Sequence, residues 1–338
     1  KEERLIWHGV PVNPLITQVE DLLKKQFNYT GPFWLYSEKI LTERLAILEK
    51  ELPHFHFYYS VKSLPNIGIL KRIQPNKNFG ADVVSGGELY RALKAGFDPK
   101  RIVFAGVGKT EAEIEYGINE KIRAFHVESI AELKDIERIA EGKKTTAHIA
   151  FRLNPDVEVD THKHITTGKE ENKFGMSEAD FLMGITILKK SKHLKLVGLQ
   201  AHIGSQLFDA TPYIKTAQYL HDKYAIIQKE LSQKIDYVSL GGGFGVKYER
   251  LEGDGIDFDF SNLGASIGAI FKDANLEVHF EPGRFIAAPT GILMTRVRHL
   301  KERTGKVIAI IDAAMNDLIR PMLYEAYHPI LSVNRREG

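Results

Sequence analysis

The chain has 338 residues, of which 43% are hydrophobic and 27% are charged, a composition typical of a globular protein with a large core. Its net charge of +2 argues against nucleic acid as a partner, and the absence of cysteine excludes disulfides, a thiolate nucleophile and thiolate metal ligands. No apolar run approaches the ~20 residues of a membrane span and no secretory signal pattern opens the chain, so we expect a cytoplasmic protein with no membrane partner.

Short apolar, β-branched runs alternate with segments of helical periodicity, beginning with a predicted helix at 38–51. Strands are predicted at 55–62, 81–85, 101–106, 124–128, 146–154, 196–203, 237–242 and 277–283. Helices are predicted between them at 87–95, 111–118, 130–139, 179–189, 213–231 and 263–271. Eight strands that alternate with helices predict an α/β protein whose parallel sheet closes as a (β/α)8 barrel of the TIM type.

The pattern changes after Arg284. Strands predicted at 291–300 and 306–312 flank a charged turn and indicate a hairpin rather than another β-α unit. The segment 1–36 has strand-like and loop-like pieces that could join it. We therefore expect a barrel domain at 37–284 and a second, β-rich domain built from 1–36 and 285–338.

In such barrels the active site lies at the carboxyl ends of the strands. Lys62 ends the first strand. A lysine in that position is usually a solvated charge, but at a barrel mouth its amine would be partly desolvated and able to form a Schiff base. Three further groups fall at strand ends, and each also has a purely structural interpretation.

Glycines 241–243 follow the seventh strand and could bring backbone N–H groups to a phosphate, or simply form a tight turn. Glu281 and Arg284 follow the eighth strand and could hold a ring nitrogen and an anion, or pair with each other. His202 could lie against a ring and Ser205 could bind phosphate, or the histidine could be a core residue. His162 and His164 lack metal-ligand spacing, so we predict loop residues and no metal site.

Several segments resemble the fold-type III pyridoxal-phosphate (PLP) decarboxylases over about residues 33–329. The general motifs are YSVK at 59–62, GADVVSGGEL at 80–89, FAGVGKT at 104–110, VES at 127–129, RLNP at 152–155, HIGSQ at 202–206, GGG at 241–243 and EPGR at 281–284. Two further motifs resemble those of the diaminopimelate decarboxylases within this family. They are THKHITTG at 161–168 with NKFG at 172–175, and DAAMNDLIRP at 312–321 with Tyr324 and AYHP at 326–329.

The resemblance implies roles for individual residues. Lys62 would carry PLP as an internal aldimine, His202 would stack on the pyridine ring, and Glu281 would pair with the ring nitrogen. The phosphate would be held by Ser205, Gly243, Gly283 and Arg284. Asp82, Glu88 and Arg152 would line the cofactor pocket, and substrate carboxylates would be bound by Arg284, Arg320 and Tyr324. The implied reaction is decarboxylation of meso-2,6-diaminopimelate to L-lysine and CO2.

Members of this family continue beyond the point where this sequence stops, with a Cys-Glu-Ser type motif and a Gly-Ala-Tyr motif. The resemblance therefore implies an incomplete β-rich domain, and a homodimer whose active sites are shared between subunits. Two alternatives stay open: a decarboxylase of another basic amino acid, of the ornithine or arginine type, and a non-catalytic PLP-binding regulatory protein. A metal-dependent barrel hydrolase fits less well, because the histidines lack ligand spacing.

Overall fold

The structure is a computed structural model that describes residues 3–4, 6–7, 9–157, 174–248 and 258–335. The chain divides into two compact units. The barrel unit consists of Leu41–Val246 and Asp257–Pro289, and the terminal unit consists of Lys1–Ile40, Lys247–Ile256 and Thr290–Gly338. The domain limits expected from the sequence, at residues 37 and 284, stay a prediction.

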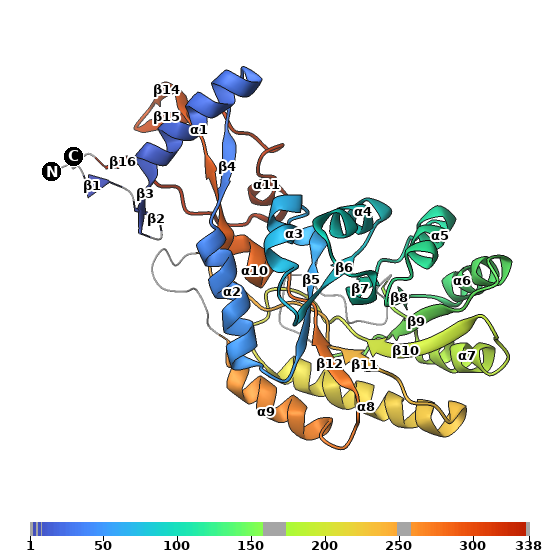
Figure 1. The fold of residues 1–338 in the computed structure, drawn as a ribbon. Coiled ribbons are helices and arrows are strands. Elements are labelled where there is room, and N and C mark those ends of the chain that lie inside the picture. Colours follow the sequence, from blue (N-terminus) through green and yellow to red (C-terminus); the bar gives the residue numbers. More distant parts are fainter. Residues whose placement is uncertain (1–2, 5, 8, 158–173, 249–257, 336–338) are drawn as a thin grey trace. The chain divides into compact units, whose positions relative to one another are not determined.

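The barrel unit is built on eight parallel strands that close on themselves (Figure 1). The strands are β5 (His56–Ser60), β6 (Phe79–Val83), β7 (Ile102–Phe104), β8 (Ala124–Val127), β9 (Ala147–Arg152), β10 (Leu194–Gln200), β11 (Tyr237–Ser239) and β12 (Glu277–Phe280). Each strand pairs with the next one in the chain, and β12 pairs with β5 to close the ring. The (β/α)8 barrel predicted from the sequence is confirmed.

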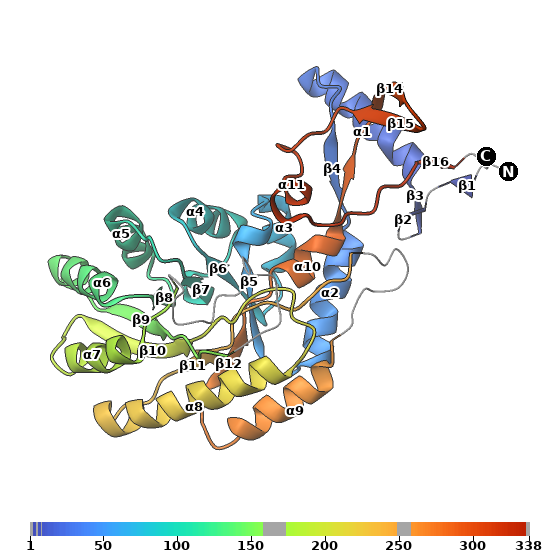
Figure 2. The ribbon, with the colours of Figure 1, turned by 180° about the vertical axis from the view of Figure 1, so that it is seen from behind.

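Helices surround the strands on the outside (Figure 2). They are α3 (Ile67–Ile73), α4 (Gly86–Ala95), α5 (Glu111–Glu120), α6 (Ile130–Gly142), α7 (Glu178–Leu188), α8 (Thr211–Leu231) and α9 (Phe260–Ile270), with α2 (Glu38–Glu51) before β5 and the short α10 (Arg284–Ala287) after β12. The sequence prediction missed α3, which begins at the N-cap residue Asn66.

Hydroxyl side chains fix where four of these helices begin. Ser85, Thr110, Ser129 and Ser177 each accept a hydrogen bond from a backbone N–H in the first turn of α4, α5, α6 and α7. Such N-caps satisfy amide groups that the helix itself leaves without acceptors. They end each loop at a defined residue, and so hold the preceding strand end in place.

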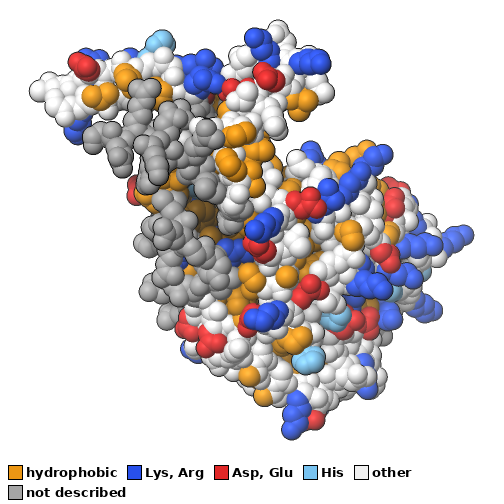
Figure 3. Space-filling view, turned by 60° about the vertical axis from the view of Figure 1, so that its left-hand side comes forward, with side chains coloured by type: hydrophobic (Ala, Val, Ile, Leu, Met, Phe, Trp, Pro, Cys, Tyr) orange, Lys and Arg blue, Asp and Glu red, His pale blue; other side chains and the backbone are white. Residues whose placement is uncertain are grey.

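The core of the barrel unit is apolar and rich in aromatic rings. Every residue of β6 and β8 is buried, as expected for parallel strands covered on both faces. The large buried rings include Phe57, Phe79, Phe104, Phe125, Phe151 and Phe280. On the outside, basic and acidic side chains are mixed over the face of the barrel unit seen in Figure 3. No helix in the described part of the chain is long and apolar enough to cross a membrane.

The terminal unit contains short antiparallel pairs and one long helix. β4 (Phe33–Tyr36) pairs with β13 (Gly291–Met294), β14 (Val297–Arg303) with β15 (Lys306–Ile311), β2 (Ile6–Trp7) with β3 (Val10–Pro11), and β1 (Glu3–Arg4) with β16 (Asn334–Arg335). The predicted hairpin is present as β14 and β15. The strand predicted at 291–300 is divided into two, because residues 291–294 form β13 and pair with β4. The sequence prediction also missed α1 (Val12–Phe27), which ends in a left-handed residue at Asn28.

Candidate active site

The carboxyl ends of the barrel strands gather the polar residues that the sequence singled out. Lys62 lies in the 3-10 turn η1 (Val61–Ser63), directly after β5. Burial raises the pKa values of Asp82 and Glu88 and lowers that of His202, and the positive charge of Lys62 acts on all three groups in the downward direction. The side chain is exposed, so the partial burial expected from the sequence is wrong; the turn carries the residue past the end of the strand. No hydrogen bond links Lys62 to any other residue that the structure describes.

Two buried carboxyl groups, Asp82 and Glu281, lie within this ring of strand ends. Asp82 Oδ2 accepts a hydrogen bond of 2.6 Å from Ser60 Oγ, while Oδ1 has no partner in the described part of the chain. Glu281 accepts bonds from Ser239 Oγ at 2.6 Å and Gln200 Nε2 at 2.9 Å. Burial, followed by the charge of Asp82, raises the pKa of Glu281 to about 7. Because both acids are buried in a low-dielectric site, ionisation of one makes ionisation of the other less favourable.

Arg152 and Glu128 form a buried ion pair beside these acids. Arg152 Nη1 lies 2.8 Å from Glu128 Oε1, and both side chains are at least nine-tenths buried. Glu128 also accepts the backbone N–H groups of Gly106 and Gly175, so it ties three loops together. Arg152 is thus held in place by a carboxylate that directly follows the neighbouring strand β8.

Glu88 is engaged with its own loop. Its Oε2 accepts the N–H of Val84 at 3.0 Å, and its N–H is capped by Ser85. Burial raises the pKa of this carboxyl group. The bond to Val84 braces the turn that follows β6, the strand that carries Asp82.

His202 follows β10 and is held in one tautomer. Its Nδ1 accepts the N–H of Gly242 at 3.2 Å, which leaves the ring proton on Nε2 when the ring is neutral. Burial lowers its pKa well below the ordinary value, and the positive charges of Lys62 and Arg152 lower it further. The ring is therefore neutral at physiological pH and fixed to the glycine-rich loop.

The loops after β10, β11 and β12 come together around glycines. A Cβ atom on Gly243, whose φ is +115°, would lie 2.5 Å from the carbonyl oxygen of Gly204, so only glycine allows this approach. Arg284 Nε donates to Ser205 Oγ at 3.1 Å and links the loop after β12 to the loop after β10. The N–H groups of Gly204, Gly243 and Gly283 donate to no residue within the described ranges. Backbone N–H groups in such a state suit an anion such as a phosphate.

The remaining predicted residues belong to the terminal unit. Arg320 opens the short helix α11 (Arg320–Tyr324), its guanidinium lies 4.7 Å from the centre of the Tyr248 ring, and its Nη1 is 3.1 Å from Nε2 of His328. Arg320 does not pair with the nearby carboxylate of Asp317, which accepts the N–H of Ala314. Tyr324 is exposed. The substrate-binding roles of Arg320 and Tyr324 stay predictions.

Some expectations fall on residues outside the described ranges, namely His162, His164 and most of the two motifs at 161–175. Among the residues that are described, no group of three or more potential ligands could hold a metal ion. Sequence reasoning missed Gln200 and Ser239 as site residues. The available signal was a polar residue ending an otherwise apolar strand, which is unusual in a parallel barrel.

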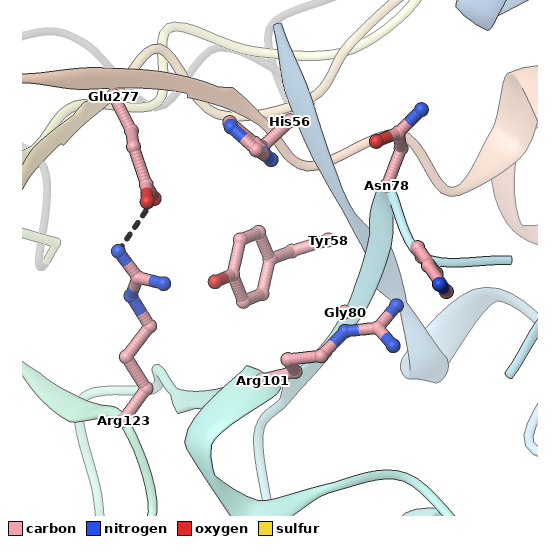
Figure 4. Close-up of a pocket in the computed structure, with 8 residues that line it drawn as sticks. His56, Tyr58, Asn78, Gly80, Arg101, Arg123 and Glu277 are labelled. Carbon is pink, nitrogen blue, oxygen red and sulfur yellow. Dashed lines mark hydrogen bonds and ion pairs between the residues drawn. The ribbon is translucent and has the colours of Figure 1, made fainter.

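A cavity of about 160 Å³ lies at the opposite face of the barrel (Figure 4). It is lined at the amino ends of the strands by His56, Tyr58, Lys77, Asn78, Gly80, Arg101, Arg123 and Glu277. In Figure 4 the hydroxyl of Tyr58 points toward Arg123, which forms an ion pair of 2.6 Å with Glu277. Polar groups at this face of a barrel usually contribute to stability rather than catalysis, so we assign the active site to the carboxyl ends.

Comparison with known proteins agrees with this assignment. Residues 38–288 match the model of the pyridoxal binding domain of pyridoxal-dependent decarboxylases. The chain belongs to this family. It is a decarboxylase whose cofactor is pyridoxal 5'-phosphate and whose substrate is an amino acid.

Diaminopimelate decarboxylases are among the most similar relatives. The enzyme of Aquifex aeolicus is 38% identical over 309 residues, which covers 90% of this chain and 72% of that protein. The enzyme of Bacteroides thetaiotaomicron is 38% identical over 313 residues, covering 90% and 80%. Among solved structures, diaminopimelate decarboxylase from Helicobacter pylori complexed with L-lysine superposes with a TM-score of 0.82 at 37% identity, over 91% of this chain and 76% of that one. A viral arginine decarboxylase, at 21% identity and a TM-score of 0.77, shares the fold.

Proposed function

We propose that this decarboxylase acts on meso-2,6-diaminopimelate and releases L-lysine and CO2 in the cytoplasm. The observation that supports the substrate most strongly is the similarity to diaminopimelate decarboxylases, at 38% identity over 90% of the chain, together with a related structure that holds L-lysine. L-lysine is the product that loss of one carboxylate from diaminopimelate would give.

The residues at the carboxyl ends of the strands fit the cofactor. Lys62 offers an amine without a hydrogen-bond partner in the described residues, and Glu281 offers a buried acceptor. Glycines 204, 243 and 283 offer backbone donors for a phosphate. When bound, PLP supplies an electron sink for the electron pair that remains when CO2 leaves.

The other side chains then have defined tasks. We assign to Lys62 the covalent attachment of the cofactor, and to Glu281 the carboxylate that keeps its ring nitrogen protonated. His202, neutral and fixed by Gly242, would cover one face of the ring. Ser205, Gly243, Gly283 and Arg284 would bind its phosphate, while Asp82, Glu88 and Arg152 would shape the pocket around it.

Substrate recognition is the task that we propose for Arg284, Arg320 and Tyr324. At its distal carbon diaminopimelate carries a carboxylate beside an ammonium group, whereas ornithine and lysine carry the ammonium group alone. A guanidinium binds a carboxylate through two parallel hydrogen bonds and repels an ammonium group that has no carboxylate beside it, so it selects diaminopimelate over these substrates. We further propose a homodimer in which a second subunit completes each active site.

Release of CO2 from carboxyl-labelled substrates tests the proposal. The PLP-loaded protein should release CO2 from meso-diaminopimelate, and at least a hundredfold more slowly from ornithine, arginine and lysine. Faster release from ornithine or arginine would transfer the substrate assignment to that amino acid. Binding of PLP with no release from any of the four would identify a cofactor-binding protein without this activity.

A further inference from the structure

A fully buried polar pair lies inside the barrel beneath Glu281. His126 projects from β8 and Tyr237 from β11, and both are 0% exposed. His126 Nε2 lies 3.0 Å from the Tyr237 hydroxyl, and its Nδ1 lies 3.7 Å from Glu281 Oε1. None of the roles assigned so far uses either side chain.

Small residues on the neighbouring strands make room for this pair. Ala124 and Ala150 pack in the same buried cluster as Tyr237. A Cβ atom on Gly198 would lie 2.6 Å from Cζ of the tyrosine ring, so glycine is required there. A barrel interior is normally filled by branched aliphatic side chains. Here the packing instead accommodates a tyrosine that reaches a histidine.

The hydrogen-bond partners available inside the barrel favour one tautomer of His126. Within the described residues, the Tyr237 hydroxyl has no acceptor other than Nε2 of His126. If Nε2 carried the ring proton, the tyrosine hydrogen would be buried without an acceptor, which costs about 1–3 kcal/mol. The bare Nδ1 lone pair would also face the carboxylate of Glu281. With the proton on Nδ1, the tyrosine hydroxyl donates to Nε2, and the Nδ1–H, which has no hydrogen-bond acceptor among the described residues, faces the carboxylate of Glu281 at 3.7 Å.

The charge states of the pair agree with this arrangement. Burial lowers the pKa of His126 well below its ordinary value, and the positive charges of Lys109 and Arg152 lower it further. Burial raises the pKa of Tyr237 well above its ordinary value. Both groups are therefore neutral around pH 7. The tautomer of His126, rather than its charge, then decides whether an N–H group or a lone pair faces the carboxylate of Glu281.

We propose that His126 is a positioning residue for Glu281, fixed by Tyr237 so that its Nδ1–H points toward the carboxylate from within the barrel. At 3.7 Å the contact is longer than a hydrogen bond, so the N–H acts on Glu281 as a dipole. It favours the ionised carboxylate. The consequence for catalysis rests on the proposed function, whereas the tautomer and its effect on Glu281 do not.

The groups that act on Glu281 are few and can be separated. Asp82, on β6, raises its pKa, and Arg152, on β9, lowers it. Ser239 and Gln200 donate hydrogen bonds to it. Tyr237→Phe leaves all four of these unchanged. It removes only the hydroxyl that fixes His126, and it keeps the ring that stacks on His279 at 4.5 Å.

Histidine NMR of the apoprotein tests the tautomer directly. In ¹⁵N-histidine-labelled protein, with the signal of His126 assigned by its loss in His126→Gln, we expect the Nδ1–H pattern from pH 6 to 8. Tyr237→Phe removes the hydroxyl that donates to Nε2 but keeps the Glu281 carboxylate near Nδ1, so a measurable share of the Nε2–H form should appear. Tyr58→Phe is the matched control, because it removes another buried phenol from the barrel but leaves His126 unchanged. An Nε2–H pattern in the wild type, or an unchanged pattern in Tyr237→Phe, would overturn the proposal.

Carboxyl ¹³C titration of the apoprotein tests the effect on Glu281. Tyr237→Phe should raise the pKa of Glu281 by roughly half a unit to one unit, and Tyr58→Phe should leave it unchanged. In the loaded enzyme, the acidic limb of the kcat profile should move upward by the same amount with KM unchanged. An unmoved Glu281 titration would contradict the inference, even in a protein that decarboxylates diaminopimelate. A protein that releases no CO2 would refute the proposed function and leave both NMR results standing.

Discussion

The raised pKa of Glu281 predicts that the barrel without cofactor loses stability as the pH rises. Burial and the charge of Asp82 raise this pKa from 4.5 to about 7. The folded state therefore binds the proton more tightly than the unfolded state. The contribution of Glu281 to stability is therefore greatest below pH 4.5, falls between pH 4.5 and 7, and is constant above. At about 1.4 kcal/mol for each pKa unit, the ionised group costs about 3 kcal/mol, and most of this cost appears between pH 5 and 8.

Glu281→Gln should remove this cost. The amide keeps the bond from Ser239 Oγ, and the Oε1 atom of Gln200, which is buried without a partner among the described residues, can turn to accept its N–H. The apoprotein variant should match the wild type near pH 5 and exceed it by about 2–3 kcal/mol at pH 8. The activity should fall, because the neutral amide cannot keep a ring nitrogen protonated.

The assay must report on the barrel unit. Both tryptophans, Trp7 and Trp34, belong to the terminal unit, so their fluorescence does not report it. Pulse proteolysis in urea, followed by mass spectrometry of barrel peptides, reports the unfolding of the barrel unit. Glu277→Gln is the control with the opposite sign, because hydrogen bonding to His279 lowers the pKa of Glu277 to about 2. That variant should be less stable than the wild type at both pH 5 and pH 8. An equal loss of stability at both pH values in Glu281→Gln would refute the reasoning.

Three further predictions concern the cofactor, the substrate and the assembly. Gly243→Ala places a Cβ 2.5 Å from the Gly204 oxygen at positive φ, and should weaken PLP binding about tenfold or more in absorbance titrations, while Gly268→Ala, which meets no atom within 4 Å, should not. Arg320→Met should cost about 30-fold or more in kcat/KM for meso-diaminopimelate with the PLP spectrum intact; an unchanged kcat/KM would place the distal carboxylate elsewhere. Sedimentation should give a dimer, and a fully active monomer would contradict shared active sites.

The barrel could be predicted from the sequence because its signals are local and repeated. Each strand is a short apolar run, and the hydroxyl residue that follows, such as Ser85 or Ser129, ends the loop and starts the helix. Helices α1 and α3 escaped prediction. The apolar residues of α1, such as Leu15, Val19 and Leu22, do recur at helical spacing, and the prediction overlooked them. Helix α3 spans only seven residues, too short for a clear period.

The site residues could be predicted because they lie at the ends of strands. The contacts of His126 with Tyr237 and Glu281 could not. Lys62, His202 and Glu281 lie close to one another only after the barrel closes, and a sequence motif already marks each of them. His126 stands within a strand between Phe125 and Val127, where a lone histidine is most often a core residue. Its tie to Tyr237, 111 positions away, exists only in three dimensions. The exposure of Lys62 likewise depends on the turn η1, which the strand pattern does not reveal.

Reduction of the PLP-loaded protein with borohydride, followed by peptide mapping, tests the central claim most directly. Among the described residues, Lys62 and Lys109 both lie near the carboxyl ends of the strands. Lys109 is buried, with its Nζ bonded to Glu132 at 2.5 Å and to the carbonyl oxygens of Gly106 and His126 at 2.8 Å, so it has no lone pair to offer. We predict one pyridoxyl group per chain, on Lys62, and none in Lys62→Ala. A pyridoxyl group on Lys109 or on any other lysine would contradict the assignment of the active site.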